Sequence, residues 1–355
     1  MKDKLTIAVV FGGQSSEHDI SCMSVQNVIA DLDQTKYDLV LVGITKDGRW
    51  LLTDDVAAIA DGTWENSKKQ VILSPDTSDH GLICLQDGQV SKIRIDCVFP
   101  VLHGKYGEDG TIQGLCELAR IPFVGCGVLA SAVCMDKATT KVIVQELGIR
   151  QADYVVITQG DLKDVSACIE RVEKKLSYPV FVKPSAAGSS QGVSKAADRD
   201  ALVKGLAEAV KHDNKVLVEE TIVGREIECA VLGGHMAKAS GVGEVLSADH
   251  EMYSYEAKYF NAQSHTDVHP KFPDGKEDEV RKDALQIFKA VGGYGLARVD
   301  FFLEKGTNEV VFNEINTMPG FTGISMYPML WKEQGVNGSM LVNALVALAF
   351  ERYNE

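Results

Sequence analysis

Two side chains that carry oxygen stand close together near the end of an apolar run. In VVFNEINTMPGFTG, residues 310–323, Glu314 and Asn316 are two residues apart and precede a Met-Pro-Gly break. Because residues two apart on a strand point to the same face, this spacing predicts that the carboxylate and the amide lie side by side. Taken alone, the stretch is also compatible with a strand end that turns into a polar loop.

The segment before this run predicts its partner strand. ARVDFFLEKGTNEVVFNEIN forms an expected hairpin whose strands, 297–303 and 309–316, are joined by a five-residue loop. Residue 303 is then expected to pair with residue 309, which puts Arg298 opposite Glu314. A slip of one residue would move half of the polar side chains to the other face. In the expected register, four polar residues share one face: Arg298, Asp300, Glu314 and Asn316.

This shared face favours a metal site. Two carboxylates that converge beside one arginine repel each other, which is costly for a face without a function. Carboxylate and amide oxygens suit Mg²⁺, which binds proteins through one or two carboxylates together with substrate phosphates. The alternative is an ion-paired sheet face around Arg298.

A lysine and a loop rich in glycine and serine could bind phosphate. VFVKPSAAGSSQGVSK predicts a strand, a loop and a second strand, with Lys183 at the end of the first strand and Ser189 and Ser190 in the loop. Backbone N–H groups and hydroxyls of such a loop can surround a phosphate, and the lysine supplies a positive charge. The pattern GxxxxGK[ST] is absent, so this is no Walker A loop. A hairpin turn without a ligand is the alternative.

The turn after Asn316 contains two glycines, Gly320 and Gly323, in TMPGFTGIS. Without a Cβ atom, such backbone can approach a substrate closely or direct an N–H group at a developing oxyanion. The Pro-Gly pair is also common in turns that only connect two secondary-structure elements.

Alternating strands and helices predict the elements that position these residues. From residue 1 to 124, the runs KLTIAVVF, YDLVLVGI and IDCVFPVL read as strands between helices, which predicts a parallel α/β sheet. The loops GGQSSEHD and HGKYGEDG follow two of these strands, where ligands of such sheets gather. Residues 125–218 and 219–355 predict two α+β segments. Within the second, residues 247–270 lack periodicity, and so long a loop is typical of a lid.

The composition excludes several classes of protein. The chain has 355 residues, a net charge of −14 and no basic block, which argues against a nucleic-acid partner. Its eight cysteines are irregularly spaced and form no CxxC pair, so they predict neither a disulfide framework nor a zinc site. No apolar run approaches about 18 residues, the length needed to span a membrane. A soluble, cytoplasmic protein is expected.

Seven segments of the chain together resemble one family. In order along the chain, they are HGKYGEDGTIQG, MDKATTK, KPSAAGSSQG, VEETIVGREIE, EAKY, ARVDFF and FNEINTMPGFT. Their order and approximate spacing are similar to those of D-alanine–D-alanine ligases of the ATP-grasp superfamily, and the similarity covers nearly the whole chain. The resemblance implies an ATP-grasp fold, in which an N-terminal α/β domain precedes two α+β subdomains with ATP between them.

The resemblance also implies an activity. The family condenses two D-alanines with ATP, through a D-alanyl phosphate, to the dipeptide used in peptidoglycan. It further implies a cytoplasmic homodimer, two Mg²⁺ ions that Mn²⁺ could replace, and K⁺ as an activator to be considered.

Motif matches assign nucleotide and metal residues. The phosphates would contact Lys137 and Lys183 under the Ser189–Ser190 loop, and Lys258 would reach the γ-phosphate from the lid. The metal ligands would be Asp300, Glu314 and Asn316, and the remaining nucleotide contacts would be Glu219, Glu220, Ile222 and Glu226.

Further matches assign the amino-acid sites. Glu17 would bind the first D-alanine's ammonium in a hydrogen-bonded set with Ser189 and Tyr259. His103 would lie near the first substrate's carboxylate, and Arg298 with the Gly320 N–H would stabilise the oxyanion. The second D-alanine's carboxylate would be bound by Ser325 and the backbone of Met326.

Three positions bear on what this chain accepts. Glu220 stands where relatives often carry lysine, so the chain departs from the family at its expected adenine contacts. Ile324 precedes Ser325 where many relatives carry a polar residue. EAKY, residues 256–259, retains the Lys-Tyr pair that relatives making D-alanyl-D-lactate usually lack. It also differs from the EKY that is frequent in relatives making D-alanyl-D-serine. Both features favour D-alanine as the second substrate.

Two alternatives stay open. The chain could use D-serine or D-lactate as the second substrate, or it could be a nucleotide-binding sensor without catalysis. Against the sensor, every matched metal and phosphate position carries a competent side chain.

Overall fold

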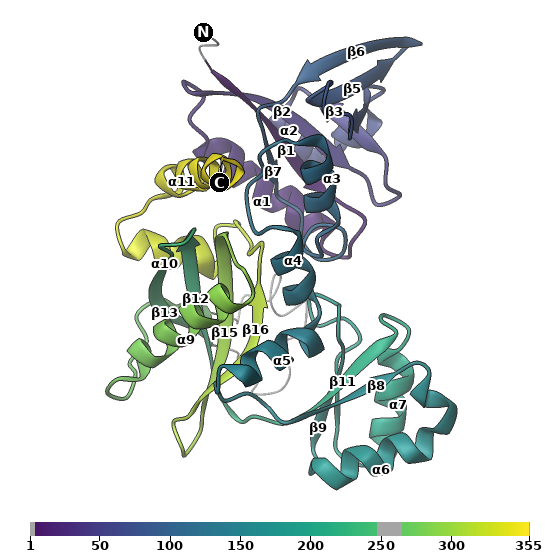
Figure 1. Cartoon of the computed structure of the whole chain (residues 1–355), viewed down its shortest axis with the longest axis vertical. Coiled ribbons are helices and arrows are strands. Elements are labelled where there is room, and N and C mark those ends of the chain that lie inside the picture. Colours follow the sequence, from purple (N-terminus) through teal and green to yellow (C-terminus); the bar gives the residue numbers. More distant parts are fainter. Residues whose placement is uncertain (1–3, 247–264, 355) are drawn as a thin grey trace.

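The strands in the described part of the chain form three separate sheets. The computed structural model describes residues 4–246 and 265–354. Figure 1 shows the first sheet at the top, the third below it at the left and the second at the lower right. Among the described residues, no helix is both long and apolar enough to cross a membrane.

The first sheet has a parallel centre and an antiparallel extension. β1 (Leu5–Gly12) pairs in parallel with β2 (Tyr37–Ile44) and with β7 (Cys97–Pro100), which confirms the predicted parallel α/β arrangement for these strands. The sequence did not predict the antiparallel extension beyond β2. It consists of β3 (Trp50–Thr53), β4 (Gln70–Leu73), β5 (Gly81–Gln86) and β6 (Gln89–Arg94).

The last helix of the chain covers this first sheet. α11 (Gly338–Tyr353) contacts α1 (His18–Asp31) and β7, and its yellow ribbon lies beside the sheet in Figure 1. Val28 of α1 and Leu345 of α11 belong to one buried cluster. The other face of the sheet is covered by α3 (Thr111–Ala119), whose buried Cys116 packs in a second cluster. Short α2 (Val56–Asp61) packs beside α1.

The second sheet is small and antiparallel, in the order β10-β9-β11-β8. Two helices pack on it, α6 (Val165–Lys175) and α7 (Arg199–Ala209), and the side chains of Asp164 and Asp198 cap their N-termini. α4 (Val128–Met135) and α5 (Lys137–Glu146) precede the sheet in the chain. Its strands are β8 (Tyr154–Thr158), β9 (Val180–Pro184), β10 (Ser194–Ala196) and β11 (Lys215–Glu220).

The third sheet carries the predicted hairpin. Its order is β14-β13-β12-β15-β16, and α9 (Lys276–Ala290) packs against its buried face. α10 (Met326–Glu333) follows the hairpin. The strands are β12 (Gly224–Gly233), β13 (Lys238–Leu246), β14 (His265–Asp267), β15 (Gly295–Glu304) and β16 (Val310–Asn316).

The predicted lid, residues 247–270, is only partly described. Residues 247–264, including Lys258 and Tyr259, lie outside the described residues. The prediction of one irregular loop up to residue 270 was wrong at its end, because residues 265–267 form β14 and pair with β13. The predicted domain limits at 124/125 and 218/219 stay predictions.

The hairpin keeps its predicted face but not its predicted register. Leu303 pairs with Val310 rather than with residue 309, and Phe301 pairs with Phe312. A bulge then intervenes, because Asp300 pairs with Glu314 and leaves Asn313 without an opposite residue.

The one-residue shift in pairing at Leu303 and the bulge at Asn313 act in opposite ways. Either of them alone would move Glu314 to the opposite face from Asp300. Together they restore the face, so that Asp300 lies opposite Glu314 and Arg298 opposite Asn316. The expected pairing of Arg298 with Glu314 was therefore wrong, although the expected common face is present. The bulge lies where the outer edge of β16 meets residues 150–151, since the Phe312 N–H donates to the Arg150 carbonyl at 2.8 Å.

Candidate active site

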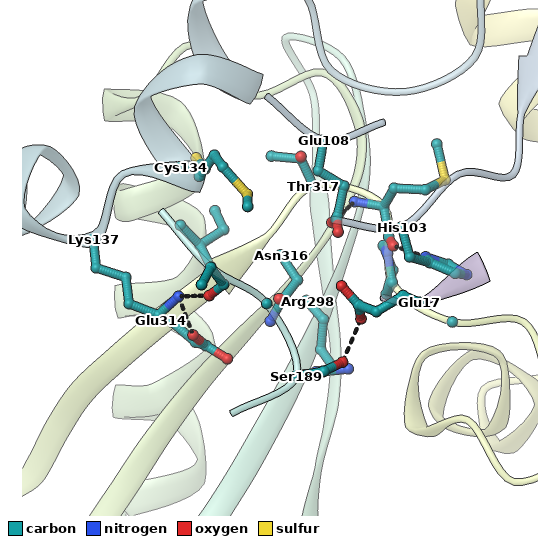
Figure 2. Close-up of a pocket in the computed structure, with 17 residues that line it drawn as sticks. Glu17, His103, Glu108, Cys134, Lys137, Ser189, Arg298, Glu314, Asn316 and Thr317 are labelled. Carbon is teal, nitrogen blue, oxygen red and sulfur yellow. Dashed lines mark hydrogen bonds and ion pairs between the residues drawn. The ribbon is translucent and has the colours of Figure 1, made fainter. Parts of the chain in front are cut away.

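One cavity brings together residues from all three sheets and their connecting loops (Figure 2). Eight of the residues singled out in the sequence line it: Glu17, His103, Lys137, Ser189, Arg298, Glu314, Asn316 and Gly320. Asp300 touches this group through Arg298 and Asn316. The other predicted residues that the structure describes do not line the cavity: Lys183, Ser190, Glu219, Glu220, Ile222, Glu226, Ser325 and Met326.

Glu17 is held between two loops. It precedes α1, it is buried, and the Ser189 hydroxyl donates to its Oε1 at 2.6 Å. A Cβ atom added at Gly104 or Gly188 would lie 2.5 Å or 2.4 Å from its Oε2. Both positions therefore need glycine for the backbone to approach the carboxylate. The predicted contact between Glu17 and Ser189 exists, and it joins the first sheet's loop to the Gly/Ser loop.

Arg298 pairs with two buried carboxylates, one on its own strand β15 and one on the neighbouring strand β12. It donates to Asp300 through Nε at 2.7 Å and Nη2 at 2.6 Å, and its Nε lies 3.1 Å from Glu228 Oε2. The Asn316 amide donates to Asp300 at 3.0 Å. Burial is the main cause that raises the pKa of Asp300 to about 7, against the opposing effect of Arg298. Sequence reasoning missed Glu228, although its alternation with Glu226 in GREIE placed two acids on one strand face.

Lys137 links the hairpin face that carries Glu314 to the Gly/Ser loop. It is the first residue of α5, and its Nζ lies 3.3 Å from Glu314 Oε2 and donates to the Ala187 carbonyl at 2.9 Å. Figure 2 shows both contacts beside the cavity. A phosphate placed here would meet a lysine that already lies next to a carboxylate.

The hairpin face has a donor set that fits Mg²⁺. Within the described ranges, no three His, Cys, Asp or Glu side chains are grouped as metal ligands. The face instead offers the carboxylates of Asp300 and Glu314 and the amide of Asn316. Mg²⁺ commonly takes one or two protein carboxylates and completes its shell with water and phosphate oxygens.

Glu219 forms the centre of a buried ion-pair triad. Its carboxylate contacts Lys183 of β9 and lies 2.7 Å from the Nζ of Lys141, which is 1% exposed. Burial acts to raise the pKa of Glu219, but the two lysines outweigh it and hold that pKa below its usual value. The predicted phosphate lysine and the predicted nucleotide acid are thus bound to each other.

Sequence reasoning missed Lys141, the third member of this triad. The only signal was its place in the matched segment MDKATTK, four residues after Lys137 and therefore one helical turn away.

The other predicted nucleotide residues lie at the end of β11 and the start of β12. Glu220 Oε1 accepts from the Asp153 N–H at 2.9 Å and from Arg150 Nη2 at 2.9 Å. Ile222 lies in the connection between the strands and Glu226 on β12 itself. Arg150 therefore already engages the unusual acid at position 220.

Ser325 and Met326 begin α10. The Ser325 hydroxyl accepts from the Thr322 N–H at 3.0 Å and lies 2.8 Å from the Thr322 hydroxyl. The Met326 side chain is buried against β13, where a Cβ atom on Gly243 would lie 2.3 Å from its sulfur. Only the backbone of Met326 is therefore suited to a ligand, whereas Ile324 is 59% exposed.

His103 uses both ring nitrogens within the protein. Nδ1 lies 3.0 Å from the Met318 carbonyl and Nε2 lies 3.3 Å from the Ser24 hydroxyl. A carbonyl can only accept, so Nδ1 carries the proton and the neutral ring accepts at Nε2. Burial is the main cause that lowers the pKa of His103, which agrees with a neutral ring.

Glu108 is a cavity residue that sequence reasoning missed. It lies in the quoted loop HGKYGEDG and accepts from the N–H groups of Gly104 at 2.7 Å and Met318 at 3.0 Å. Burial and the nearby Glu17 raise its pKa to about 8. The signal available in the sequence was a carboxylate in a loop at the end of a parallel strand, where ligand sites gather.

We expect the protein to lose stability in mild acid because His103 is buried and neutral. An unfolded histidine binds a proton near pH 6.5, whereas the folded protein resists it, so the unfolded state binds more protons as the pH falls below that value. Charges facing the ring act in both directions, since Glu17 raises its pKa and Arg298 lowers it. The fall in melting temperature between about pH 7.5 and about pH 5.5 should therefore be smaller in His103→Asn, which has no titrating ring. Equal falls in the two proteins would contradict this.

Comparison with known proteins gives matches over almost the whole chain. Residues 6–126 match the family model for the D-ala D-ala ligase N-terminus, and residues 143–347 match that for the D-ala D-ala ligase C-terminus. A D-alanine–D-alanine ligase from Acetivibrio thermocellus is 48% identical, with 100% of this chain and 98% of the relative covered.

Two solved structures are similar along nearly their whole length. The VanG D-Ala:D-Ser ligase from Enterococcus faecalis is 37% identical with a TM-score of 0.88, covering 98% of this chain and 99% of that one. The D-alanine–D-alanine ligase from Coxiella burnetii is 35% identical with a TM-score of 0.85, covering 99% and 95%. Matches of this extent relate both the sequence and the fold to those proteins.

Proposed function

The chain belongs to the D-alanine–D-alanine ligase family, and we propose that it joins two D-alanines to D-alanyl-D-alanine with ATP, for peptidoglycan precursors. Full-length sequence similarity shows this family membership. The observation that supports the activity is the cavity, which the hydrogen-bonded Glu17–Ser189 pair lines together with four further predicted residues, Lys137, Arg298, Glu314 and Gly320.

The first step would activate one D-alanine. Glu17 binds the ammonium group of this D-alanine. The carboxylate of the same D-alanine attacks the γ-phosphorus of ATP, which releases ADP and forms a D-alanyl phosphate. Lys137 at the cavity and Lys183 at the triad offset the negative charge that this step brings together. Lys183 would have to exchange Glu219 for a phosphate, and Lys141 would then remain as the counter-ion of the buried Glu219.

The second step would form the peptide bond. The neutral amine of a second D-alanine attacks the acyl carbon, and an oxyanion develops on the former carboxylate. As the amide forms, the nitrogen loses one proton, which the departing phosphate takes up. Arg298 and the Gly320 N–H would stabilise that oxyanion, and inorganic phosphate then leaves. Ser325 and the Met326 backbone would bind the second D-alanine's carboxylate, and the Lys258–Tyr259 pair would complete the closed site.

ATP and a divalent metal are the cofactors that the family implies. We propose two Mg²⁺ ions held by Asp300, Glu314 and Asn316, with Mn²⁺ as a substitute and K⁺ as an activator. When bound, Mg²⁺ neutralises phosphate oxygens and polarises the phosphoryl group. The nucleotide would be held by Lys137, Lys183, Ser189, Ser190, Glu219, Glu220, Ile222, Glu226 and Lys258.

A cytoplasmic homodimer is the proposed state of the enzyme. All eight cysteines are free thiols, and seven of them are buried. That usage suits a reducing compartment, in which disulfides rarely persist.

The identity of the second substrate is the sharpest test of this function. With ATP and Mg²⁺, we expect ADP release to require D-alanine and to match dipeptide formation. A small pocket discriminates between substrates that differ by one small group by about 1–3 kcal/mol. When D-serine or D-lactate is added in an amount equal to D-alanine, D-alanyl-D-alanine should therefore exceed the mixed product by about tenfold or more.

The competing function is a D-alanyl-D-serine ligase, and its support is the similarity to the VanG structure. A dominant mixed product would establish that function instead. ADP release without any dipeptide would contradict both, and nucleotide binding without turnover would indicate a non-catalytic sensor.

A further inference from the structure

The turn that carries Gly320 is held by the opposite end of the chain. Residues 318–321 connect β16 to α10 in the third sheet's part of the molecule. Their backbone is hydrogen-bonded by side chains that lie 210 to 297 residues earlier in the sequence. Those side chains are Ser24, Asn27, His103 and Glu108.

Both polar groups of Met318 are engaged. Its N–H donates to Glu108 Oε1 at 3.0 Å, and its carbonyl accepts from His103 Nδ1 at 3.0 Å. The other Glu108 oxygen accepts from the Gly104 N–H, which anchors the carboxyl group to its own loop. Figure 2 labels both His103 and Glu108 among the residues that line the cavity.

Both polar groups of Phe321 are engaged as well. Its N–H donates to the Ser24 hydroxyl at 3.3 Å, and its carbonyl accepts from the Asn27 amide at 2.7 Å. The Ser24 hydroxyl can donate to the neutral His103 Nε2 while it accepts from Phe321. One consistent chain of hydrogen bonds therefore connects Met318 to Phe321 through His103 and Ser24.

Gly320 lies between these two fixed residues, with only Pro319 separating it from Met318. Because proline fixes its own φ angle, little freedom is left to the N–H of Gly320. A hydrogen-bond donor stabilises an oxyanion only at a well-defined distance, and a misplacement of about 1 Å can cost about 100-fold in rate.

We propose that Ser24, Asn27, His103 and Glu108 are positioning residues, which hold the Gly320 N–H where the second step needs its donor. Glu108 and Asn27 have the clearest roles, since each binds one backbone group of the turn directly. This inference rests on the proposed function, because it concerns the step in which the second amine attacks the acyl phosphate.

The test separates the two chemical steps. Full-length enzyme with ATP, Mg²⁺ and D-alanine is assayed for dipeptide formation and for D-alanine-dependent scrambling of the bridging oxygen of isotope-labelled ATP, which reports acyl-phosphate formation. In Glu108→Leu, both acceptors are lost, and we expect the ratio of scrambling to dipeptide formation to rise about 10- to 100-fold. Asn27→Leu should raise it in the same direction by a smaller factor.

Two variants serve as controls. Gln26→Leu changes the neighbouring residue of α1 and should leave the ratio unchanged. Within the described residues, the Gln26 amide donates to the Cys22 carbonyl of the same helix and makes no hydrogen bond with the turn of Gly320. Glu108→Gln keeps an amide oxygen that can accept from Met318, and should restore the ratio to within about threefold of the unmodified enzyme.

A merely structural role of Glu108 would slow both steps equally and leave the ratio constant, which would overturn the inference. An unchanged ratio in both Glu108→Leu and Asn27→Leu would do the same. If the unmodified enzyme formed no dipeptide, the proposed function itself would fail in the same assay, and the inference with it.

Discussion

Replacing Glu314 with glutamine is expected to abolish dipeptide synthesis, with a loss of at least about 10³-fold in kcat, or about 4 kcal/mol of transition-state stabilisation. Glu314 is the proposed ligand that faces Lys137 at 3.3 Å and lies opposite Asp300 in the hairpin. The amide has similar volume but no charge, so it cannot balance Lys137 or bind a cation with equal strength. The assay measures dipeptide and ADP at saturating substrates.

The fold should survive this change. The Glu314 side chain is 26% exposed, so its replacement leaves no fully buried charge, and the melting temperature should move by only a few degrees. Glu309→Gln is the matched control, because this acid lies at the exposed end of the same hairpin with 57% of its side chain exposed. Substantial dipeptide synthesis by Glu314→Gln would remove Glu314 from the proposed metal site.

The second large effect is expected on stability. Glu219→Gln removes the carboxylate that Lys141 and Lys183 share, and it leaves two buried ammonium groups facing a neutral amide. Loss of one partner of a buried ion pair typically costs about 3–5 kcal/mol. We therefore expect the melting temperature to fall by roughly 10 °C, at about 2–4 °C per kcal/mol. Differential scanning calorimetry at neutral pH measures the change.

The adjacent acid provides the control. Glu220 pairs with Arg150 at 2.9 Å, but their side chains are 30% and 37% exposed, and such pairs contribute only about 0–1 kcal/mol. Glu220→Gln should therefore shift the melting temperature far less than Glu219→Gln.

A double variant tests the cause. Adding Lys141→Met to Glu219→Gln removes one of the two stranded charges and should recover part of the lost stability, which gives a favourable coupling in the double-mutant cycle. If Glu219→Gln had the same melting temperature as Glu220→Gln, the triad would not contribute to the stability of the fold.

Sequence periodicity was sufficient for the common face of the hairpin and insufficient for its register. The two-residue spacings of Arg298 with Asp300 and of Glu314 with Asn316 are properties of each strand alone. The pairing depends on the hairpin loop and on the bulge at Asn313, which lies where β16 meets residues 150–151. That contact joins segments about 160 residues apart, so no local pattern contains it.

Short sequence segments predicted most of the residues that line the cavity, but they did not predict the hydrogen-bond and ion-pair partners of those residues. Glu17, Lys137, Ser189 and Glu314 were identified within quoted segments and line the cavity. The environment of each residue was not readable from those segments. Lys183 was expected at a phosphate and pairs with Glu219, and His103 was expected at a substrate and bonds to Met318 and Ser24.

By itself, the sequence determined the fold class, the family and the identity of most polar residues that line the cavity, because these depend on residue types and on spacings within short segments. Tertiary structure alone decided which charges are buried together, as for Lys141 with Glu219, and which distant side chains hold the turn of Gly320. The physical reason is distance along the chain. Ser24 and Phe321 are 297 residues apart, and only the packing of α1 and α11 on the first sheet, with the hairpin beneath them, brings such residues within hydrogen-bonding range.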